Sequence, residues 1–497
     1  MEKEFKTLIE KIKNYNPEAG LDKVKKAFIF VSEAHLGQVR LSGEPVLDHL
    51  LSVAEILADW KLDTTSIIAG LLHDVIEDGG KTLEEVKKEF GEQVAELVWG
   101  VTKIGELKLR GSVEEQFVEN LRKMLVVMAH DLRVVLIKLA DRYHNMQTLS
   151  FLPEEKQKRI AKETLEVYAP LAERLGIGEI KGRLEDLAFP YVYPQDFAWV
   201  RNYSVPYYHQ AEEYVQGARK AILEELKKEK IKAEVSGRAK HLYSLWRKLL
   251  RPEVDKDITK IHDLVALRIL VNSVRDCYAA LGVVHKIWKP VPFVGISDFI
   301  AVPKPNGYRS IHTKVFGPGG KIIEVQIRTY EMHEEAENGI AAHWYYGHLK
   351  TAGVSGKRLR DGVFAPDEKL SWVKQLVAWQ KEMVDSSEFL DALKFDALRH
   401  RIFVFSPNGD VFDLPVESSP IDFAYAVHTE LGDKAVGAKV NGKMVSLDSK
   451  LKSGDMVEIL TSEKKKGPSR DWLSFVVTRV AKKEILKHFR SSKDRPS

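Results

Sequence analysis

The chain has 497 residues, too many for one hydrophobic core, and this length predicts about three domains. Lysine and arginine number 76 against 72 acidic residues, so the net charge of +4 does not by itself indicate nucleic acid or a membrane as a partner. Cys277 is the only cysteine, which excludes a disulfide within the chain and a zinc site of several cysteines. There is no signal-peptide core and no apolar run near the ~18 residues of a membrane span, so we expect a soluble, cytoplasmic protein with no membrane partner.

Residues 1–195 are expected to form an all-helical domain. Their apolar residues repeat with helical spacing, and few strand signals interrupt them. The proline and aromatic residues at 189–194 predict the boundary of this domain.

Side chains that favour a divalent metal lie in this first domain, each in a segment that we expect to be helical. They are His49, the adjacent His73 and Asp74, and Asp141. Asp141 follows the apolar run VVLIKLA, where a carboxylate is costly unless it is paired or bound to a metal. His73 and Glu77 are four residues apart, as are Asp74 and Asp78, so a helix would place each pair on one face.

The alternative is that these are ordinary residues, because a lone histidine near an apolar run is usually a hydrogen-bonded core or surface residue. The order His, His-Asp, Asp along separate helices favours the metal site. Ligation by nitrogen and oxygen alone suits Mn²⁺, Fe²⁺ or Zn²⁺ and does not choose among them. Such a metal would bind phosphate oxygens and lower the pKa of a bound water to roughly 7. Glu77 and Asp78 would then orient or deprotonate that water, which predicts a metal-dependent phosphohydrolase.

Residues 196–347 mix helices and strands, which predicts a separate α/β or α+β domain. A long amphipathic helix is expected first, followed by strands; the segments are 207–230 and then 264–271, 297–302, 310–317 and 321–329.

A basic segment after Gly237 contains Arg238, Lys240, Ser244 and Lys248. The last three are four residues apart and should line one face of a helix. Cations and a hydroxyl beside a helix start suit a triphosphate. The alternative, a solvated basic face, would be preferred if this segment stood alone.

Two strand segments strengthen the triphosphate interpretation. Glu324, Gln326 and Arg328 alternate with apolar residues, so they should share one face of a strand, while Asp263 opens a second apolar strand. A pair of strand-borne carboxylates, here Asp263 and Glu324, is what a Mg²⁺-assisted transfer of a phosphoryl-type group needs.

The segment VPKPNGYRSIHT lies between these strands and supplies Lys304, Asn306, Tyr308 and His312. Tyr308 could stack on a base, and Lys304 and His312 could contact phosphates.

The remaining residues predict a linker and connecting helix at 348–396 and a small β-grasp domain at 397–463. Within the β-grasp we expect a hairpin, a short helix, a second hairpin turning at Asn441-Gly442, and a final strand. Residues 464–497 should form a basic run and then the start of a helical segment.

In combination, these segments resemble the RelA/SpoT homologue family, the long stringent-response enzymes that make and degrade (p)ppGpp. The resemblance runs from about residue 20 to the end and rests on HLGQVRLSGEP, LLHDVIEDG, KLADRYHNM, GRAKHLYS, PKPNGYRSIHT, EVQIRT and IAAHWYYG. The first domain resembles the family's HD-type hydrolase, the second its nucleotidyltransferase-like pyrophosphokinase, and the β-grasp its TGS domain.

For the hydrolase, the resemblance implies Mn²⁺ as cofactor and (p)ppGpp as substrate. The implied Mn²⁺ ligands are His49, His73, Asp74 and Asp141, and the implied hydrolytic acids are Glu77 and Asp78. The residues implied to line the guanosine pocket are Arg40, Ser42 and Asn145.

For the synthetase, it implies ATP, GDP or GTP as substrates and Mg²⁺ as cofactor. Arg238, Lys240, Ser244 and Lys248 match the ATP-binding set, and Asp263 and Glu324 match the Mg²⁺ carboxylates. Glu324 can also help to deprotonate the acceptor hydroxyl. Tyr308 matches the residue that stacks on guanine, with Lys304, Asn306 and His312 around the acceptor phosphates; Gln326 and Arg328 complete the expected substrate contacts.

The chain departs from the family pattern in three places. Gly295-Ile296-Ser297-Asp298 stands where members usually carry Arg-x-Lys-Asp or Glu-x-Asp-Asp, charges linked to acceptor preference and metal dependence. Leu41 stands where lysine is common. The chain ends just after the TGS domain, without the family's helical, zinc-finger-like and ACT modules, as expected of a truncated form.

The leading prediction is a bifunctional alarmone synthetase and hydrolase. The alternatives are a hydrolase with a weak or regulatory synthetase domain, a ribosome- and tRNA-sensing factor, and a generic HD nucleotidase, which would leave residues 200–345 unexplained. The TGS domain implies ribosome and deacylated tRNA as partners. His428, expected on the β-grasp helix, could contact an unpaired base or be a surface histidine without a role. The sequence does not predict the oligomeric state.

Overall fold

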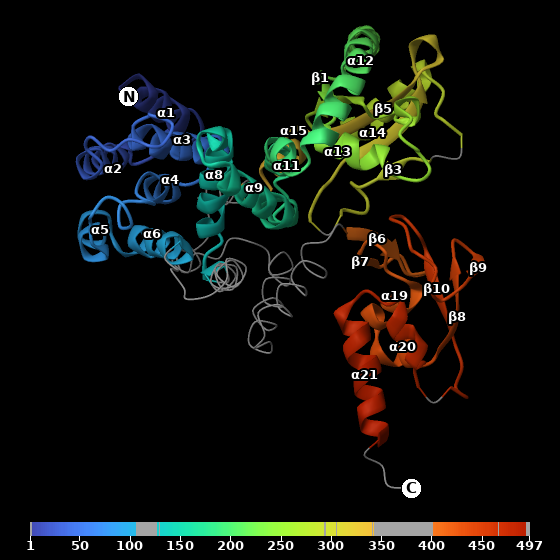
Figure 1. The fold of residues 1–497 in the computed structure, drawn as a ribbon. Coiled ribbons are helices and arrows are strands. Elements are labelled where there is room, and N and C mark those ends of the chain that lie inside the picture. Colours follow the sequence, from blue (N-terminus) through green and yellow to red (C-terminus); the bar gives the residue numbers. More distant parts are fainter. Residues whose placement is uncertain are drawn as a thin grey trace. The chain divides into compact units, whose positions relative to one another are not determined.

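The computed structural model describes residues 2–105, 127–128, 130–292, 295–304, 306–339, 341, 401–465 and 467–493. The chain forms two compact units, Met1–Gly111 with Asn120–Val373 and Ser112–Glu119 with Lys374–Ser497 (Figure 1). The expected linker and connecting helix at 348–396 lie outside the described residues. In the described part of the chain no helix combines the length and apolarity needed to cross a bilayer.

The first part of the first unit is helical, as predicted. Its helices are α1 (Glu2–Tyr15), α2 (Leu21–Ala34), α3 (Val46–Asp59), α4 (Thr64–Leu71), α5 (Leu83–Phe90), α6 (Glu92–Gly105), α8 (Arg133–Gln147), α9 (Glu154–Glu163), α10 (Ala169–Arg174) and α11 (Gly178–Val192). Helices α3, α4 and α8 pack against one another. Leu50, Val53, Ile67 and Val135 from these helices are buried, and this apolar contact fixes the position of the polar side chains between them.

The prediction that one helix continues through His73 and Asp78 is wrong. Helix α4 ends at Leu71, and residues 72–78 form consecutive turns. In a continuing α-helix the Gly70 carbonyl would accept from the amide of Asp74. Here it accepts from Nδ1 of the His73 ring at 2.8 Å, so a side-chain bond takes up the carbonyl where the helix stops.

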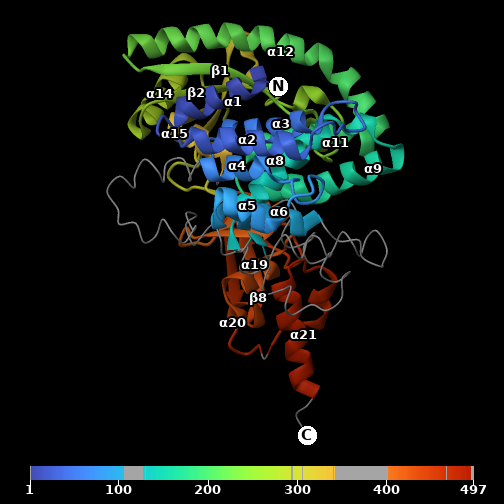
Figure 2. The ribbon, with the colours of Figure 1, turned by 90° about the vertical axis from the view of Figure 1, so that its left-hand side faces the viewer.

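Helix α12 (Pro194–Lys228) is longer than the helix expected over 207–230 (Figure 2). Pro190 lies inside α11 and Pro194 opens α12, so the proline-aromatic segment is a junction between helices. The early part of α12 packs Val200 with Phe189 and Trp246, whereas its later part packs Ile222 against the sheet that follows.

That sheet has the order β1-β2-β5-β4-β3. The strands are β1 (Ala233–Ala239), β2 (Val265–Val271), β3 (Ser297–Asp298), β4 (Ile311–Phe316) and β5 (Ile322–Thr329). Strands β2 and β5 are parallel, and the other neighbours are antiparallel. Helices α12 and α14 (Val274–Ile287) cover one face with a common apolar core, which confirms a mixed α/β domain.

Three details of this domain differ from expectation. Strand β1 contains Gly237 and Arg238, which the sequence analysis did not assign to a strand, because every second β1 side chain is exposed and the apolar pattern is weak. Lys240 precedes α13 (Leu242–Leu249), so only Ser244 and Lys248 of the basic segment are on the helix. The strand expected over 297–302 is confined to β3, since Asp298 accepts from the amides of Ile300 and Ala301 and turns the chain.

The second unit has the predicted β-grasp order. Its elements are β6 (Arg401–Phe405), β7 (Val411–Pro415), α19 (Pro420–Val427), α20 (Thr429–Asp433), β8 (Ala435–Val440), β9 (Lys443–Val445), β10 (Val457–Thr461) and α21 (Arg479–Lys493). Asn441 and Gly442 have φ of 53° and 78°, as the tight turn between β8 and β9 requires. The prediction of a single helix through His428 is wrong, because α19 ends at Val427 and His428 is the N-cap of α20.

Candidate functional site

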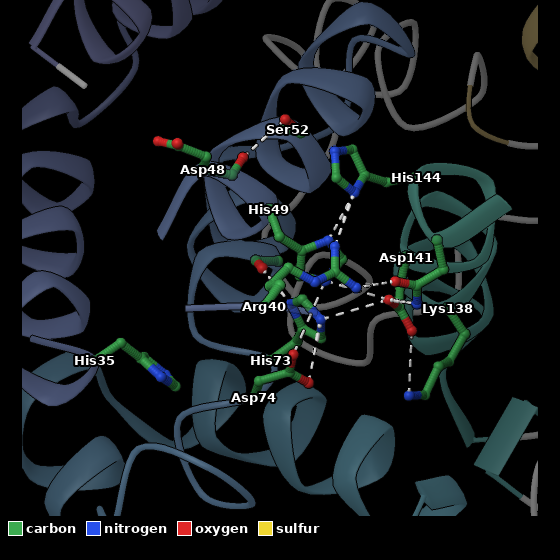
Figure 3. A network of polar contacts seen from close by, with 12 residues as sticks. His35, Arg40, Asp48, His49, Ser52, His73, Asp74, Lys138, Asp141 and His144 are labelled. Atoms are coloured by element: carbon green, nitrogen blue, oxygen red, sulfur yellow. Dashed lines mark hydrogen bonds and ion pairs between the residues drawn. The ribbon is translucent and has the colours of Figure 1, made fainter. Parts of the chain in front are cut away.

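The expected metal ligands converge between α3, the turns after α4, and α8 (Figure 3). Nε2 of His49 lies 3.4 Å from Asp141 Oδ1, and Nε2 of His73 lies 3.2 Å from Asp74 Oδ1. One potential ligand atom from each of His49, His73 and Asp141 lies within 4.8 Å of the others. Asp74 Oδ2 is 3.9 Å from His49 Nε2, so all four expected residues meet. We call these four residues the metal cluster.

The chemistry of His73 fits a metal ligand. Its side chain is 0% exposed, its Nδ1 donates to Gly70, and within the described part of the chain its Nε2 has no hydrogen-bond partner. A backbone bond at one ring nitrogen fixes the tautomer that leaves the other nitrogen free for a cation. Burial disfavours charge on His73, but Asp74 and Asp141 outweigh it and raise the pKa of His73 to about 9. A proton can therefore balance this acidic cluster where a divalent cation would otherwise do so.

His144 and Arg40 form hydrogen bonds on the side of His49 that faces away from the metal cluster. Nδ1 of His49 lies 2.8 Å from Nδ1 of His144, to which Arg40 also donates at 3.3 Å. Burial, His49 and Arg40 lower the pKa of His144 to about 4, so its Nδ1 is an acceptor and His49 keeps Nε2 toward the cluster. Asn145 donates to Asp141 at 2.6 Å and accepts from Arg40. The sequence analysis missed His144, although it stands in KLADRYHNM three residues after Asp141.

Glu77 and Asp78, the expected hydrolytic acids, follow in the turns beyond the cluster. Burial of the carboxyl group, aided by the charges of Asp74 and Asp78 and opposed by Lys138, raises the pKa of Glu77 to about 7. The residue as a whole is exposed, so water can reach this carboxyl. A carboxyl group with a pKa near the working pH is suited to general base catalysis.

A cavity of about 320 Å³ lies beside the metal cluster. Arg40, Ser42 and Asn145, the expected guanosine-pocket residues, all line it. Leu41 lines it too and is 72% exposed. The sequence analysis missed further lining residues, namely Arg142, Thr148, Arg159 and Glu163.

In the second domain, Asp263 is held between two of the expected ATP-binding lysines. Its carboxylate oxygens lie 2.7 Å from Lys240 Nζ and 2.7 Å from Lys248 Nζ. Burial alone would raise the pKa of Asp263, but the two lysines hold it well below its usual range. Ser244 donates toward Glu185 on α11 at 3.5 Å.

The face of the sheet opposite α12 and α14 carries the other expected residues, and we call it the polar face. Arg238, Glu324, Gln326, Arg328 and His312 alternate with the core residues of β1, β5 and β4, which confirms the alternation predicted for β5. Gln326 and His312 pair across β5 and β4, and both contact Glu324, at 3.0 and 3.3 Å.

Tyr308 and Lys304 border this face. The Tyr308 hydroxyl lies 2.8 Å from His312 Nε2, and Lys304 Nζ lies 5.0 Å from the centre of the Tyr308 ring. The Tyr308 ring and a nearby cation suit a stacked base with phosphates. Asn306 instead uses its side chain to accept from the Tyr308 amide at 3.2 Å, which shapes the loop.

Arginines gather on the polar face. Arg328 is 0% exposed, and none of the described residues forms a hydrogen bond with its Nε or Nη1. Arg268, which the sequence analysis missed, shares Glu337 with Arg328 at 3.1 and 3.0 Å. Burial, together with Arg328, lowers the pKa of Arg268 to about 10. Buried arginine donors without partners mark a place where an anionic ligand would be stabilised.

The metal cluster thus lies in the helical domain, and the polar face of the separate sheet domain carries groups that suit phosphates. Residues 27–178 match the family described as HD domain, residues 237–351 match the region found in RelA / SpoT proteins, and residues 402–461 match the TGS domain. The chain belongs to the RelA/SpoT family.

Three relatives support this membership. The chain is 49% identical to the GTP pyrophosphokinase of Myxococcus xanthus, with 95% of this chain and 61% of that protein covered. It is 46% identical to the bifunctional (p)ppGpp synthase/hydrolase RelA of Mycobacterium tuberculosis, covering 95% and 63%. It is 45% identical to the guanosine-3′,5′-bis(diphosphate) 3′-pyrophosphohydrolase of Aquifex aeolicus, covering 98% and 67%. The chain thus spans less than two thirds of the length of the first two relatives.

Proposed function

We propose that this protein is a bifunctional alarmone enzyme. Its hydrolase would remove the 3′-pyrophosphate of (p)ppGpp to give GDP or GTP, and its synthetase would transfer pyrophosphate from ATP to the 3′-hydroxyl of GDP or GTP. The observation that carries this proposal is the presence of two separate polar centres in one unit, the metal cluster and the polar face with Asp263 near it. We assign hydrolysis to residues 1–195, synthesis to 196–347 and the TGS domain to 397–463, in a cytoplasmic protein.

For the hydrolase, we propose Mn²⁺ at the metal cluster. When bound, the cation would neutralise the phosphate oxygens and acidify a water. Arg40 and Asn145 stand between the cluster and the cavity, where they would orient the nucleoside. Glu77 would take the proton from the attacking water.

Glu77→Gln should lower the turnover number for ppGpp by about 10²–10⁴-fold, because the variant keeps the metal ligands and loses the base. A base works deprotonated, so wild-type turnover should rise with pH through the pKa of Glu77 and level off above it. A bound cation lowers that pKa, so the rise should be centred at or below pH 7. Steady-state hydrolysis from pH 5 to 9 at saturating Mn²⁺ would show both effects.

Glu84→Gln is the matched control, since Glu84 is an exposed glutamate on α5. It should retain the wild-type profile. Full turnover in Glu77→Gln would exclude Glu77 as the base.

For the synthetase, we propose Mg²⁺ as the cofactor, which Asp263 and Glu324 would hold. Burial opposes ionisation of both carboxyl groups, but their neighbours lower both pKa values. The charges of Lys240 and Lys248 do so for Asp263, and hydrogen bonding to His312 and Gln326 does so for Glu324. The ATP phosphates would draw the two lysines away from Asp263 and so free its oxygens for the cation. Tyr308 would stack on the acceptor guanine.

A hydrolase with a weak or regulatory synthetase is the second candidate, and the Gly295–Asp298 segment favours it. The Asp298 carboxylate accepts hydrogen bonds from the amides of Ile300 and Ala301 and from the Tyr278 hydroxyl at 2.9 Å. No charged side chain of this segment is then left for the acceptor. Incubation with ATP and GDP in Mg²⁺, and separately with ppGpp in Mn²⁺, distinguishes the two candidates.

We further propose that the TGS domain contacts the end of a deacylated tRNA on the ribosome through His428. This residue is exposed, and its Nδ1 accepts from the amide of Glu430 at 3.3 Å, so its ring is fixed at the start of α20. A fixed, exposed ring can stack on an unpaired base.

His428→Asn should weaken tRNA and ribosome binding by about fivefold or more at every salt concentration, because stacking is worth roughly 1–3 kcal/mol per base. Asparagine is a good helix cap, so α20 should be preserved. The salt dependence should keep its slope, since no phosphate contact is lost. Equal affinities of wild type and variant in filter-binding titrations would leave His428 a surface residue.

A further inference from the structure

Among the described side chains that line the cavity beside the metal cluster, Glu163 is the only carboxylate. Its side chain is 13% exposed; its Oε2 lies 3.4 Å from Arg142 Nη2 and its Oε1 lies 2.8 Å from Arg159 Nη1. A carboxylate repels phosphate, so its presence in a cavity that binds a nucleotide points to a ligand group that donates hydrogen bonds.

The backbone is distorted at this position in a way that fixes the carboxylate. Helix α9 ends at Glu163, and a π-helical turn follows over Thr164–Tyr168. Residues five apart point about 140° away from each other in an α-helix, whereas the wider π turn brings them closer to one face. Glu163 and Tyr168 therefore reach the same guanidinium, since the Arg142 guanidinium carbon lies 4.1 Å from the centre of the Tyr168 ring. Such π turns are frequent at functional sites.

The polar contacts show which side of the cavity is nearer to the metal cluster. Asn145 and Arg40 connect it to the metal cluster through Asp141 and His144. A nucleoside 3′-pyrophosphate with its phosphates at the cluster would place its ribose beside these two residues. The base would then extend toward the side of the cavity formed by Glu163 and Arg159.

We propose that Glu163, together with Arg159, selects guanine in the hydrolase site. Guanine presents O6, N1–H and the 2-amino group along one edge, an acceptor followed by two donors. Arg159 would donate to O6, and the Glu163 carboxylate would accept from N1–H and the 2-amino group. Adenine presents a donor and an acceptor at the corresponding positions and would be rejected. This inference rests on the proposed hydrolase function and adds a specificity-determining residue to it.

The test compares ppGpp with its inosine analogue, which lacks only the 2-amino group. Wild type should hydrolyse ppGpp with a kcat/KM about tenfold or more above that of the analogue, because hydrogen bonds to a charged acceptor are among the strong ones. In Glu163→Gln the preference should shrink toward equality, mainly through a higher KM for ppGpp. Glu154→Gln, an exposed glutamate on the same helix, should behave as wild type.

Binding of both nucleotides measured in EDTA keeps the test independent of turnover. Equal affinities of wild type for the two nucleotides would overturn the proposal, whether or not any variant folds. An equal loss for both nucleotides in Glu163→Gln, with a lower melting temperature, would also overturn it and leave Glu163 as a support for Arg142. A binding preference that Glu163→Gln removes, without Mn²⁺-dependent turnover in wild type, would support guanine selection and contradict the hydrolase proposal instead.

Discussion

His73→Ala should abolish hydrolysis of ppGpp and remove the stabilisation of the protein by Mn²⁺. The His73 ring is buried, and none of the described residues hydrogen-bonds to its Nε2, so this nitrogen is available as a ligand that alanine cannot supply. A ligand that binds only the folded state at 100 times its dissociation constant stabilises that state by about 2.7 kcal/mol. Thermal melts with and without Mn²⁺ should therefore show a clear upward shift for wild type and almost none for the variant.

His209→Ala is the matched control, because His209 is an exposed histidine on α12. It should keep both the Mn²⁺ shift and hydrolysis. His73→Ala should retain transfer of pyrophosphate from ATP, since the polar face is built from other elements. A variant that still gains thermal stability from Mn²⁺ would show that the cation binds elsewhere.

The metal cluster was predictable because its polar side chains occur in apolar segments of the sequence. A histidine or carboxylate inside an apolar helix needs a partner, and this argument identified His49 on α3 and Asp141 on α8 from sequence alone. The alternation along β5 was equally reliable, since the strand period separates Glu324 from its buried neighbour Val325.

The parts that were not predicted depend on contacts between distant residues. The apolar periodicity of the sequence continues beyond Leu71, although α4 ends there. The hydrogen bond from the His73 ring to the Gly70 carbonyl replaces the backbone bond that would have continued the helix. Strand β1 has a weak pattern of its own and is defined by its pairing with β2. Arg268 and Glu337 are far apart in the sequence of the sheet domain, and only the fold brings them into contact.

Asp263→Ala should lower pyrophosphate transfer by at least about 10²-fold and leave ppGpp hydrolysis intact. Charge stabilisation by a divalent cation is worth several kcal/mol, and each 1.36 kcal/mol is a factor of ten in rate. The substitution would also leave Lys240 and Lys248 without the carboxylate that each contacts at 2.7 Å. Repulsion between the two lysines should then destabilise this domain in the absence of ATP, and a lower melting temperature should accompany the loss of rate.

Asp263→Asn separates the loss of charge from the loss of packing, because asparagine keeps the shape but not the negative charge. It should lose transfer as alanine does, while it retains more thermal stability. Glu253→Ala, an exposed acidic residue in the segment after α13, should leave both reactions unchanged. Rates of ppGpp formation from ATP and GDP in Mg²⁺, measured beside hydrolysis in Mn²⁺, provide the readout. If Asp263→Asn kept wild-type transfer, the cation would have to be held without Asp263, and the role proposed for the two lysines would be wrong as well.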